Sequence, residues 1–124
     1  MLKYSITRTP NPRSAAERAA IFADPGFGKH FTEHMVAIDW DKDAGWHDAQ
    51  VRPYGPLSLD PAASVLHYGQ EIFEGIKAYR HADGSIWTFR PQANGERLQR
   101  SAARLALPLL PVAEFVESLL QFIA

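Results

Sequence analysis

From Phe31 to Trp40 the sequence follows a pattern with a period of two, in which two kinds of side chain alternate. One side carries His34, Val36, Ile38 and Trp40, and the other carries Met35, Ala37 and Asp39. This alternation predicts a β-strand, because successive side chains of a strand point to opposite faces. The sequence DKDAG that follows is typical of a turn, and WHDAQVRPY is typical of a returning strand. The chain is therefore predicted to contain a β-hairpin here.

Shorter elements are predicted before and after this hairpin. Residues 2–8 have the pattern of a short strand, and Ser14-Ala15-Ala16-Glu17 has the pattern of a capping box that starts a helix ending near Ala23. Asp60 followed by Pro61 predicts the start of a second short helix over residues 61–67.

The second half of the sequence predicts another hairpin and two helices. The strands IKAYR and SIWTFR are joined by HADG, whose Asp-Gly pair is a strong turn signal. From Pro91 onward the spacing is helical, with arginines at 97, 100 and 104 along one side. LPLLP ends that helix, and VAEFVESLLQFI begins another with a broad apolar face. Mixed strands and helices with hairpins predict an α+β fold.

Composition narrows the class of protein. The 124 residues suit one domain or part of one, and 46% of them are hydrophobic. A formal net charge of −1 argues against nucleic acid as a partner, and no apolar run is long enough for a membrane span. The chain has no cysteine, which excludes thiolate metal sites and cysteine nucleophiles. We expect a cytoplasmic protein. We also expect this chain to be part of a longer one, because its last residues form an apolar helix that needs a partner.

The sequence HFTEH, residues 30–34, contains two histidines four apart with a glutamate between them. Some zinc peptidases use such a pattern on a helix. Two residues four apart on a strand lie roughly 13 Å from each other, too far to share one metal ion. Because the surrounding pattern predicts a strand, we expect no metal site, and we place His30 at the entrance of the strand and His34 on its face.

The segment VLHYGQEIFEGIKAYRHADGSIWTFRPQANGERLQRSA, residues 65–102, carries the chain's most specific signal. It closely resembles the branched-chain amino acid aminotransferases, which are fold-type IV enzymes that use pyridoxal phosphate. FGKHFTEHMVAIDWD upstream is also similar to a segment of that family. The resemblance implies amino-group exchange between leucine, isoleucine or valine and 2-oxoglutarate, and a homodimeric enzyme.

The resemblance assigns a cofactor role to Arg97, which matches the arginine that binds the cofactor phosphate. A forked cation is well suited to a phosphate group. On spacing alone, each of Arg97, Arg100 and Arg104 would be a solvated surface charge, and the resemblance changes that interpretation for Arg97 only.

Four further residues match positions that form the family's substrate site. Phe27, Tyr68 and Phe73 correspond to side chains that line the pocket for the substrate side chain, and Gly75 corresponds to a glycine close to that pocket. Aromatic rings provide an apolar wall of fixed shape. Without the resemblance, the three aromatic residues would be interpreted as ordinary core residues, and Gly75 as a glycine at a bulge or strand start.

The resemblance also predicts a domain organisation. Residues 1–26 would form an extension with a short helix, and residues 27–124 the front portion of the family's small N-terminal domain. The lysine that bonds to the cofactor lies in the family's large domain, so we expect no catalytic residue in this chain and no activity from it alone. Lys77 matches a position that the family does not use as that lysine.

Two other functions remain open at this point. The chain could be a binding domain that takes up a ligand or a protein partner without catalysis. It could also come from a related fold-type IV enzyme, a D-amino acid aminotransferase or an aminodeoxychorismate lyase, although the match through LHY and FTEHM is then expected to be weaker.

Overall fold

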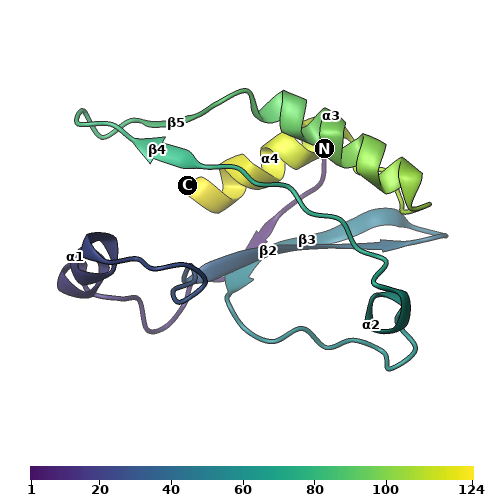
Figure 1. Cartoon of the computed structure of the whole chain (residues 1–124), viewed down its shortest axis with the longest axis horizontal. Coiled ribbons are helices and arrows are strands. Elements are labelled where there is room, and N and C mark those ends of the chain that lie inside the picture. The colour runs from purple at the N-terminus through teal and green to yellow at the C-terminus, as the bar shows by residue number, and fades with distance from the viewer. The chain divides into compact units, whose positions relative to one another are not determined.

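The computed structural model describes residues 1–124, which form two compact units. One unit comprises residues 2–57, and the other comprises Met1 with residues 58–124. Both contain strands and helices, so the prediction of mixed α and β structure is confirmed (Figure 1). No helix is long and apolar enough to cross a membrane.

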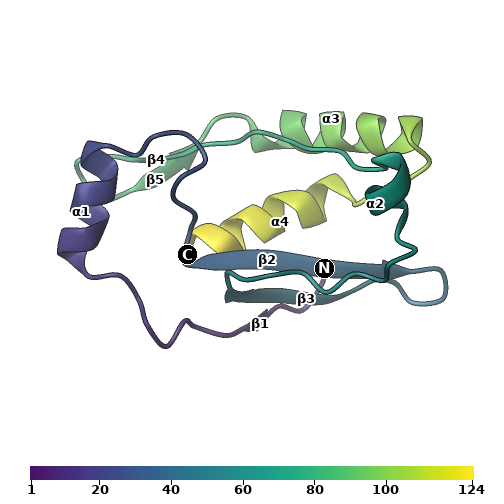
Figure 2. The same ribbon diagram turned by 60° about the horizontal axis from the view of Figure 1, so that its bottom comes forward.

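The unit of residues 2–57 is built on a three-stranded sheet. Its strands are β1 (Ser5–Ile6), β2 (His34–Asp41) and β3 (Gly45–Pro53), in the order β1-β3-β2. β1 runs parallel to β3, and β2 runs antiparallel to it (Figure 2). The predicted hairpin is confirmed, and the predicted strand over residues 2–8 is reduced to two residues. The core of this sheet lies on β3, where Ala49 and Val51 are buried.

The turn of this hairpin is organised by one side chain. Oδ1 of Asp41 accepts hydrogen bonds from the backbone amides of Asp43 and Ala44, at 2.8 and 2.7 Å. Gly45 closes the turn at φ 71°, a conformation that glycine adopts without steric cost. A register shift between Ala37 and Asp39 then interrupts the alternation that the sequence predicts for the whole strand.

Helix α1 (Ala15–Ala23) begins at the predicted capping box. The Ser14 hydroxyl accepts a hydrogen bond from the Glu17 amide, and the Glu17 carboxylate accepts one from the Ser14 amide. These two bonds satisfy amides that a helix start otherwise leaves without partners. The prediction of a short helix over these residues is therefore confirmed.

The other unit contains a pair of packed helices, α3 (Pro91–Arg104) and α4 (Val112–Ile123), both as predicted. Gly95 of α3 is buried, and a methyl group at its Cα would lie 3.0 Å from Phe115 and 3.1 Å from Val112. The missing side chain of Gly95 therefore permits the close approach of α4. Ala102, one of the few buried apolar residues of the chain, is also on α3.

The second predicted hairpin is confirmed but is shorter than expected. Its strands are β4 (Ala78–Arg80) and β5 (Ile86–Thr88), joined through Gly84 at φ 86°. Pairing ends early because Arg90, two residues beyond β5, turns into the left-handed region at φ 48°. An extended strand cannot continue through that conformation.

The prediction for helix α2 (Ser64–Tyr68) is wrong at its start. Asp60 does not cap the helix, and Pro61 is not its first residue. The Asp60 carboxylate accepts from the Ala62 amide, and its carbonyl accepts from the Ala63 amide, so Asp60 closes a separate turn. The helix begins after that turn and ends at Gly69, which has φ 57°.

Candidate functional site

The segment that links α2 to β4, residues 70–77, starts with a tight turn at Gln70, where the Glu71 amide donates to the Gly69 carbonyl at 2.8 Å. It then follows an extended path to β4 and has two different faces (Figure 1). Exposure alternates along it: Gln70, Ile72, Glu74 and Ile76 are half-buried, and Glu71, Phe73, Gly75 and Lys77 are exposed. This alternation is what an extended backbone produces, although the segment pairs with no other strand. Neighbouring residues of the segment therefore present their side chains in opposite directions.

On its inner face this segment holds Arg97 of helix α3. Nε and Nη2 of Arg97 donate to the two carboxylate oxygens of Glu74, at 2.6 and 2.7 Å. Nδ2 of Asn94, one helical turn earlier, donates to Glu74 at 2.9 Å and to the Gly75 carbonyl at 3.2 Å. A paired, two-point contact of this kind fixes the plane of the guanidinium as well as its position.

The two partners differ in their access to solvent. The Glu74 side chain is only 6% exposed, and the Arg97 side chain is 59% exposed. The hydrogen bonds from Arg97, with help from Asn94, hold the pKa of Glu74 below its usual range. Glu74 in turn raises the pKa of Arg97. Both groups are therefore ionised at neutral pH, and the positive partner is the one that faces solvent.

A further contact ties the same segment to the far end of α3. Nε2 of Gln70 donates to the carbonyl of Leu105, the residue that ends the helix, at 2.8 Å. Residues 70–75 are thus bonded to α3 near both of its ends, and the segment runs alongside the helix (Figure 1).

Arg97 can still donate hydrogen bonds to a ligand after these contacts. A guanidinium has five N–H donors, and the pairing with Glu74 occupies two of them. The remaining donors belong to an exposed, permanently charged group whose orientation is already fixed. Such a group can bind a dianion such as a phosphate without first losing the conformational freedom of a flexible side chain.

The four residues predicted for the substrate site are all exposed. Phe73 and Gly75 share the outer face of the segment, and Tyr68 lies at the end of α2. Tyr68 and Phe73 are 85% and 90% exposed, and Phe27, in the unit of residues 2–57, is fully exposed. The interpretation of these aromatic residues as core residues is wrong.

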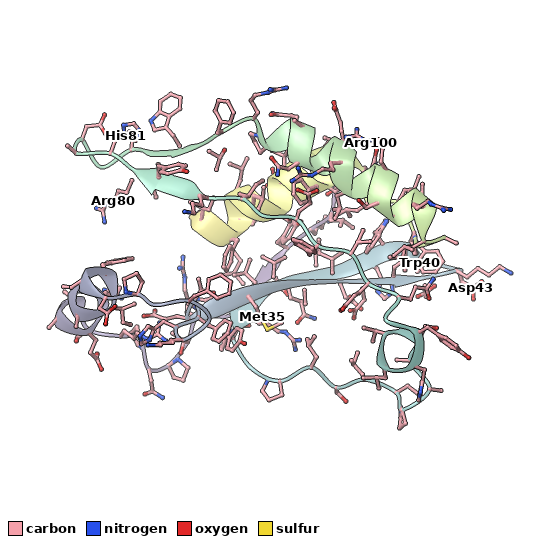
Figure 3. All side chains as sticks on the ribbon, in the orientation of Figure 1. Met35, Trp40, Asp43, Arg80, His81 and Arg100 are labelled. Atoms are coloured by element: carbon pink, nitrogen blue, oxygen red, sulfur yellow. The ribbon has the colours of Figure 1, made fainter.

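Two hollows lie beside the β4–β5 hairpin. One, of about 400 Å³, is lined by Gly75, Ile76, Lys77, Tyr79, Phe89 and Asn94. The other, of about 470 Å³, is lined by Tyr79, His81, Trp87, Thr88 and Phe89. In Figure 3, His81 lies at the end of the β4–β5 hairpin, and Arg100 lies on α3. Two residues already described line the first hollow: Gly75, which is predicted for the substrate site, and Asn94, which donates a hydrogen bond to Glu74.

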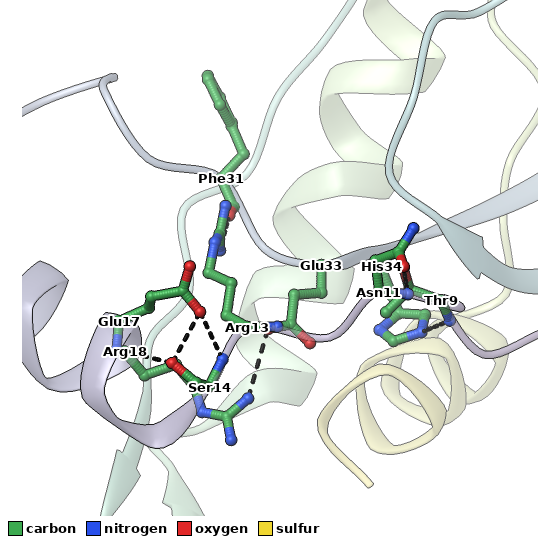
Figure 4. A network of polar contacts seen from close by, with 9 residues as sticks. All are labelled: Thr9, Asn11, Arg13, Ser14, Glu17, Arg18, Phe31, Glu33 and His34. Carbon is green, nitrogen blue, oxygen red and sulfur yellow. Dashed lines mark hydrogen bonds and ion pairs between the residues drawn. The ribbon is translucent and has the colours of Figure 1, made fainter.

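The HFTEH segment serves a different purpose in the unit of residues 2–57 (Figure 4). Nε2 of His34 accepts a hydrogen bond from the Thr9 amide at 2.9 Å. The Glu33 carboxylate accepts from the Arg13 amide at 2.8 Å, and Nη1 of Arg18 lies 3.4 Å from it. Nη1 of Arg13 donates to the Phe31 carbonyl at 2.8 Å. These contacts hold residues 9–13 against the start of β2.

The prediction that HFTEH is not helical is confirmed. The predicted start of the strand at Phe31 is wrong: β2 begins at His34, and residues 30–33 have no regular structure. His34, which was expected to have a structural role, accepts a hydrogen bond from a backbone amide, and Glu33 accepts one from another. No cluster of three histidine, aspartate or glutamate side chains in the molecule has a geometry able to hold a metal ion.

The sequence did not reveal Glu74 as the partner of Arg97, or Asn94 as a second hydrogen-bond donor to Glu74. Both belong to the quoted motif, but they are separated from each other by 20 residues, and Glu74 from Arg97 by 23. One local signal was present: Glu74 is the charged member of the alternating sequence I-F-E-G-I, in which its apolar neighbours at 72 and 76 share its face. A charge on the inner face of an extended segment requires a partner.

Comparison with known proteins supports the resemblance to branched-chain aminotransferases. The chain is 62% identical over 123 residues to the branched-chain-amino-acid aminotransferase of Mycolicibacterium smegmatis, covering 99% of this chain and 33% of that protein. It is 63% identical over 108 residues to a probable enzyme of the same name from Streptomyces coelicolor, covering 87% and 30%. It is 47% identical over 98 residues to branched-chain-amino-acid transaminase 1 of Bacillus subtilis, covering 79% and 28%.

These matches confirm the predicted similarity and extend it beyond the two segments that carry it, to nearly the whole chain. The chain spans about a third of the length of the curated relatives it matches. No family model matches it.

Proposed function

We propose that this chain, a homologue of the branched-chain-amino-acid aminotransferases over nearly its whole length, is part of an enzyme with that activity. The reaction would transfer the amino group of leucine, isoleucine or valine to 2-oxoglutarate. The cofactor would be pyridoxal phosphate, which withdraws electrons from the carbon that carries the amino group. The fold would be the small domain of the fold-type IV enzymes over residues 27–124, in a homodimer.

The observation that carries this proposal is the state of Arg97. It is exposed, charged and held in one orientation by Glu74, and it keeps unused N–H donors. These properties fit a phosphate with a charge near −2, which charge-assisted hydrogen bonds from arginine bind well. Arg97 would hold the cofactor by its phosphate and leave the reacting end of the cofactor free.

The outer face of residues 70–77 would contact the substrate. The ring of Phe73 offers an apolar wall for an aliphatic side chain, and Gly75 leaves room beside it because it has no side chain. Tyr68 would add a second wall and a hydroxyl group. Phe27 carries the same proposed role on the resemblance alone.

A panel of substrates tests the reaction on the intact protein, meaning the full-length enzyme of which this chain is proposed to be part. We expect leucine, isoleucine and valine each to yield glutamate from 2-oxoglutarate when pyridoxal phosphate is present. Turnover of D-alanine, or release of pyruvate from aminodeoxychorismate, in place of these reactions would assign the chain to a related fold-type IV enzyme. No turnover of any of these substrates would favour a binding domain.

Replacement of Arg97 by lysine tests the phosphate site. Lysine keeps the positive charge but loses the fork of donors, so cofactor affinity is expected to fall about 10- to 100-fold. Arg104→Lys on the same helix is the matched control, because Arg104 makes no contact with Glu74. Equal effects of the two substitutions would contradict the assignment of Arg97.

A further inference from the structure

We propose that Glu74 is a positioning residue: it fixes the guanidinium of Arg97 for the cofactor phosphate and couples that group to the substrate face of residues 70–77. This inference rests on the proposed function, because it takes Arg97 as the phosphate ligand. It adds Glu74 to the residues to which the resemblance assigns a role.

The geometry of the pair is the first argument. Both carboxylate oxygens of Glu74 are bonded to Arg97, at 2.6 and 2.7 Å, on the Nε and Nη2 edge of the guanidinium. The Nη1 group therefore lies at the opposite corner and makes no bond within the chain. The pairing holds Arg97 by one edge and leaves the other edge for a ligand.

Burial is the second argument. The Glu74 side chain is only 6% exposed, and Asn94 supplies it with an additional hydrogen bond at 2.9 Å. A carboxylate with this little access to water loses much of its hydration, so the hydrogen bonds from Arg97 and Asn94 stabilise its charge in place of water. Glu74 is consequently a fixed anchor, and the exposed Arg97 is the group that it orients.

Position in the chain is the third argument. Glu74 stands between Phe73 and Gly75, whose positions face the opposite side of the extended segment. Asn94 bonds both the Glu74 carboxylate and the Gly75 carbonyl, so one side chain of α3 fixes both residues. A shift of Glu74 would move the guanidinium on one face and the proposed substrate wall on the other.

A purely electrostatic view predicts the opposite effect of Glu74. A negative charge close to Arg97 repels a phosphate, so removing it would strengthen phosphate binding. If Glu74 acts by positioning, removing its charge releases the guanidinium and weakens phosphate binding. The sign of the effect therefore distinguishes the two explanations.

The test compares pyridoxal phosphate with pyridoxal, which lacks the phosphate, on the intact cofactor-free protein. The ratio of the two dissociation constants, measured by absorbance titration, isolates the contribution of the phosphate. We expect Glu74→Gln to lower the preference for pyridoxal phosphate about tenfold or more, the size of the loss of a charge-assisted hydrogen bond. Glu96→Gln, which removes an exposed charge beside Arg97 on the same helix, is expected to leave the preference unchanged.

Glu74→Asp covers the case in which the glutamine variant does not fold. It keeps the charge but shortens the side chain by one carbon, so the positioning account expects a loss of preference here too. The substrate readout is the Michaelis constant for leucine, which we expect to rise in both Glu74 variants and not in Glu96→Gln.

The outcomes separate the two levels of the proposal. The role of Glu74 alone would be overturned by one set of results. In that set, the preference for pyridoxal phosphate over pyridoxal falls in Arg97→Lys, is unchanged or increased in Glu74→Gln, and is unchanged in Glu74→Asp. A preference that Arg97→Lys leaves unchanged would overturn the phosphate site, and the proposed function with it.

Discussion

Two arginine–glutamate networks lie in the two units of this chain, and they use their donors differently. In the unit of residues 2–57, Glu33 accepts from the backbone amide of Arg13 at 2.8 Å and from the Arg18 side chain at the longer distance of 3.4 Å. The Arg13 side chain donates to a backbone carbonyl. In the other unit, Glu74 accepts hydrogen bonds from one arginine, Arg97, through its side chain. That guanidinium makes no bond to a backbone group.

The difference separates a network that holds the chain from one that presents a charge. Bonds to backbone groups fix the path of the chain, which is a structural task. Bonds between side chains, with the anion buried and the cation exposed, fix the direction of a charge that faces solvent. Breaking the first network is therefore expected to cost stability, and breaking the second is expected to cost ligand affinity.

Gly95→Val is expected to have the largest effect on stability. The added side chain would overlap Phe115 and Val112, so helix α4 must move away from the helix that carries Arg97. We expect a loss of about 2–3 kcal/mol in the free energy of unfolding, typical of an overpacked interface. Chemical denaturation of the intact protein measures it. Gly55→Val is the control, since nothing lies within 4 Å of a methyl group there. Equal losses at both positions would refute the close approach of the helices.

Glu33→Ala breaks the structural network and is expected to have the next largest effect. The part-buried amide of Arg13 loses its acceptor, which costs about 1–2 kcal/mol in the free energy of unfolding. The preference for pyridoxal phosphate over pyridoxal should not change. Asp39→Ala, on the exposed side of β2, is the control for the loss of a negative charge. If Glu33→Ala kept its stability and lost cofactor affinity, the Glu33 network would have the role that we assign to the Glu74 network.

Ser14→Ala weakens the helix next to the same network by a smaller amount. It removes the hydroxyl that accepts from the Glu17 amide, and loss of such a cap costs about 1 kcal/mol. Thermal denaturation is the measurement, with Ser58→Ala as the control outside any helix. An unchanged melting temperature would show that α1 does not contribute to the stability of the unit.

The smallest effect is expected from His47 on strand β3. Its hydrogen bond to Asp48, at 3.0 Å, and the negative charge of Asp41, at 2.8 Å, raise the pKa of His47. Because the folded pKa is raised, the stabilisation is fully present below the ordinary histidine pKa. It is lost as pH rises through the folded value.

Titration of the His47 ring by NMR measures this shift. Asp48→Asn is expected to lower the pKa of His47. The control is Asp43→Asn, which removes a nearby negative charge in the hairpin turn that makes no bond to the ring. A pKa that does not respond to Asp48→Asn would remove the assigned cause.

The sequence predicts elements whose signals are local, and it fails where partners are distant. Helix α4 was predicted with its observed bounds because its apolar spacing and the preceding LPLLP are contained in one short stretch. The predicted start of α2 was wrong because an aspartate such as Asp60 can either cap a helix or close a turn, and the neighbouring residues do not decide between the two.

The candidate site shows the same limit. The motif pointed to Arg97, but its partner lies 23 residues earlier, and no periodicity relates the two. The exposure of Tyr68 and Phe73 could not be predicted either, because a large aromatic residue in a sequence is as consistent with a core as with a binding surface.

The most direct test of the central claim compares the two arginines in one experiment. Pyridoxal phosphate and pyridoxal are titrated into cofactor-free intact protein that carries either Arg97→Lys or Arg13→Lys. If Arg97 binds the phosphate, Arg97→Lys lowers the preference for the phosphorylated compound about 10-fold or more, and Arg13→Lys leaves it at the value of the unsubstituted protein. A preference that falls equally in both variants, or in neither, would contradict the claim that Arg97 is the group presented to a phosphate.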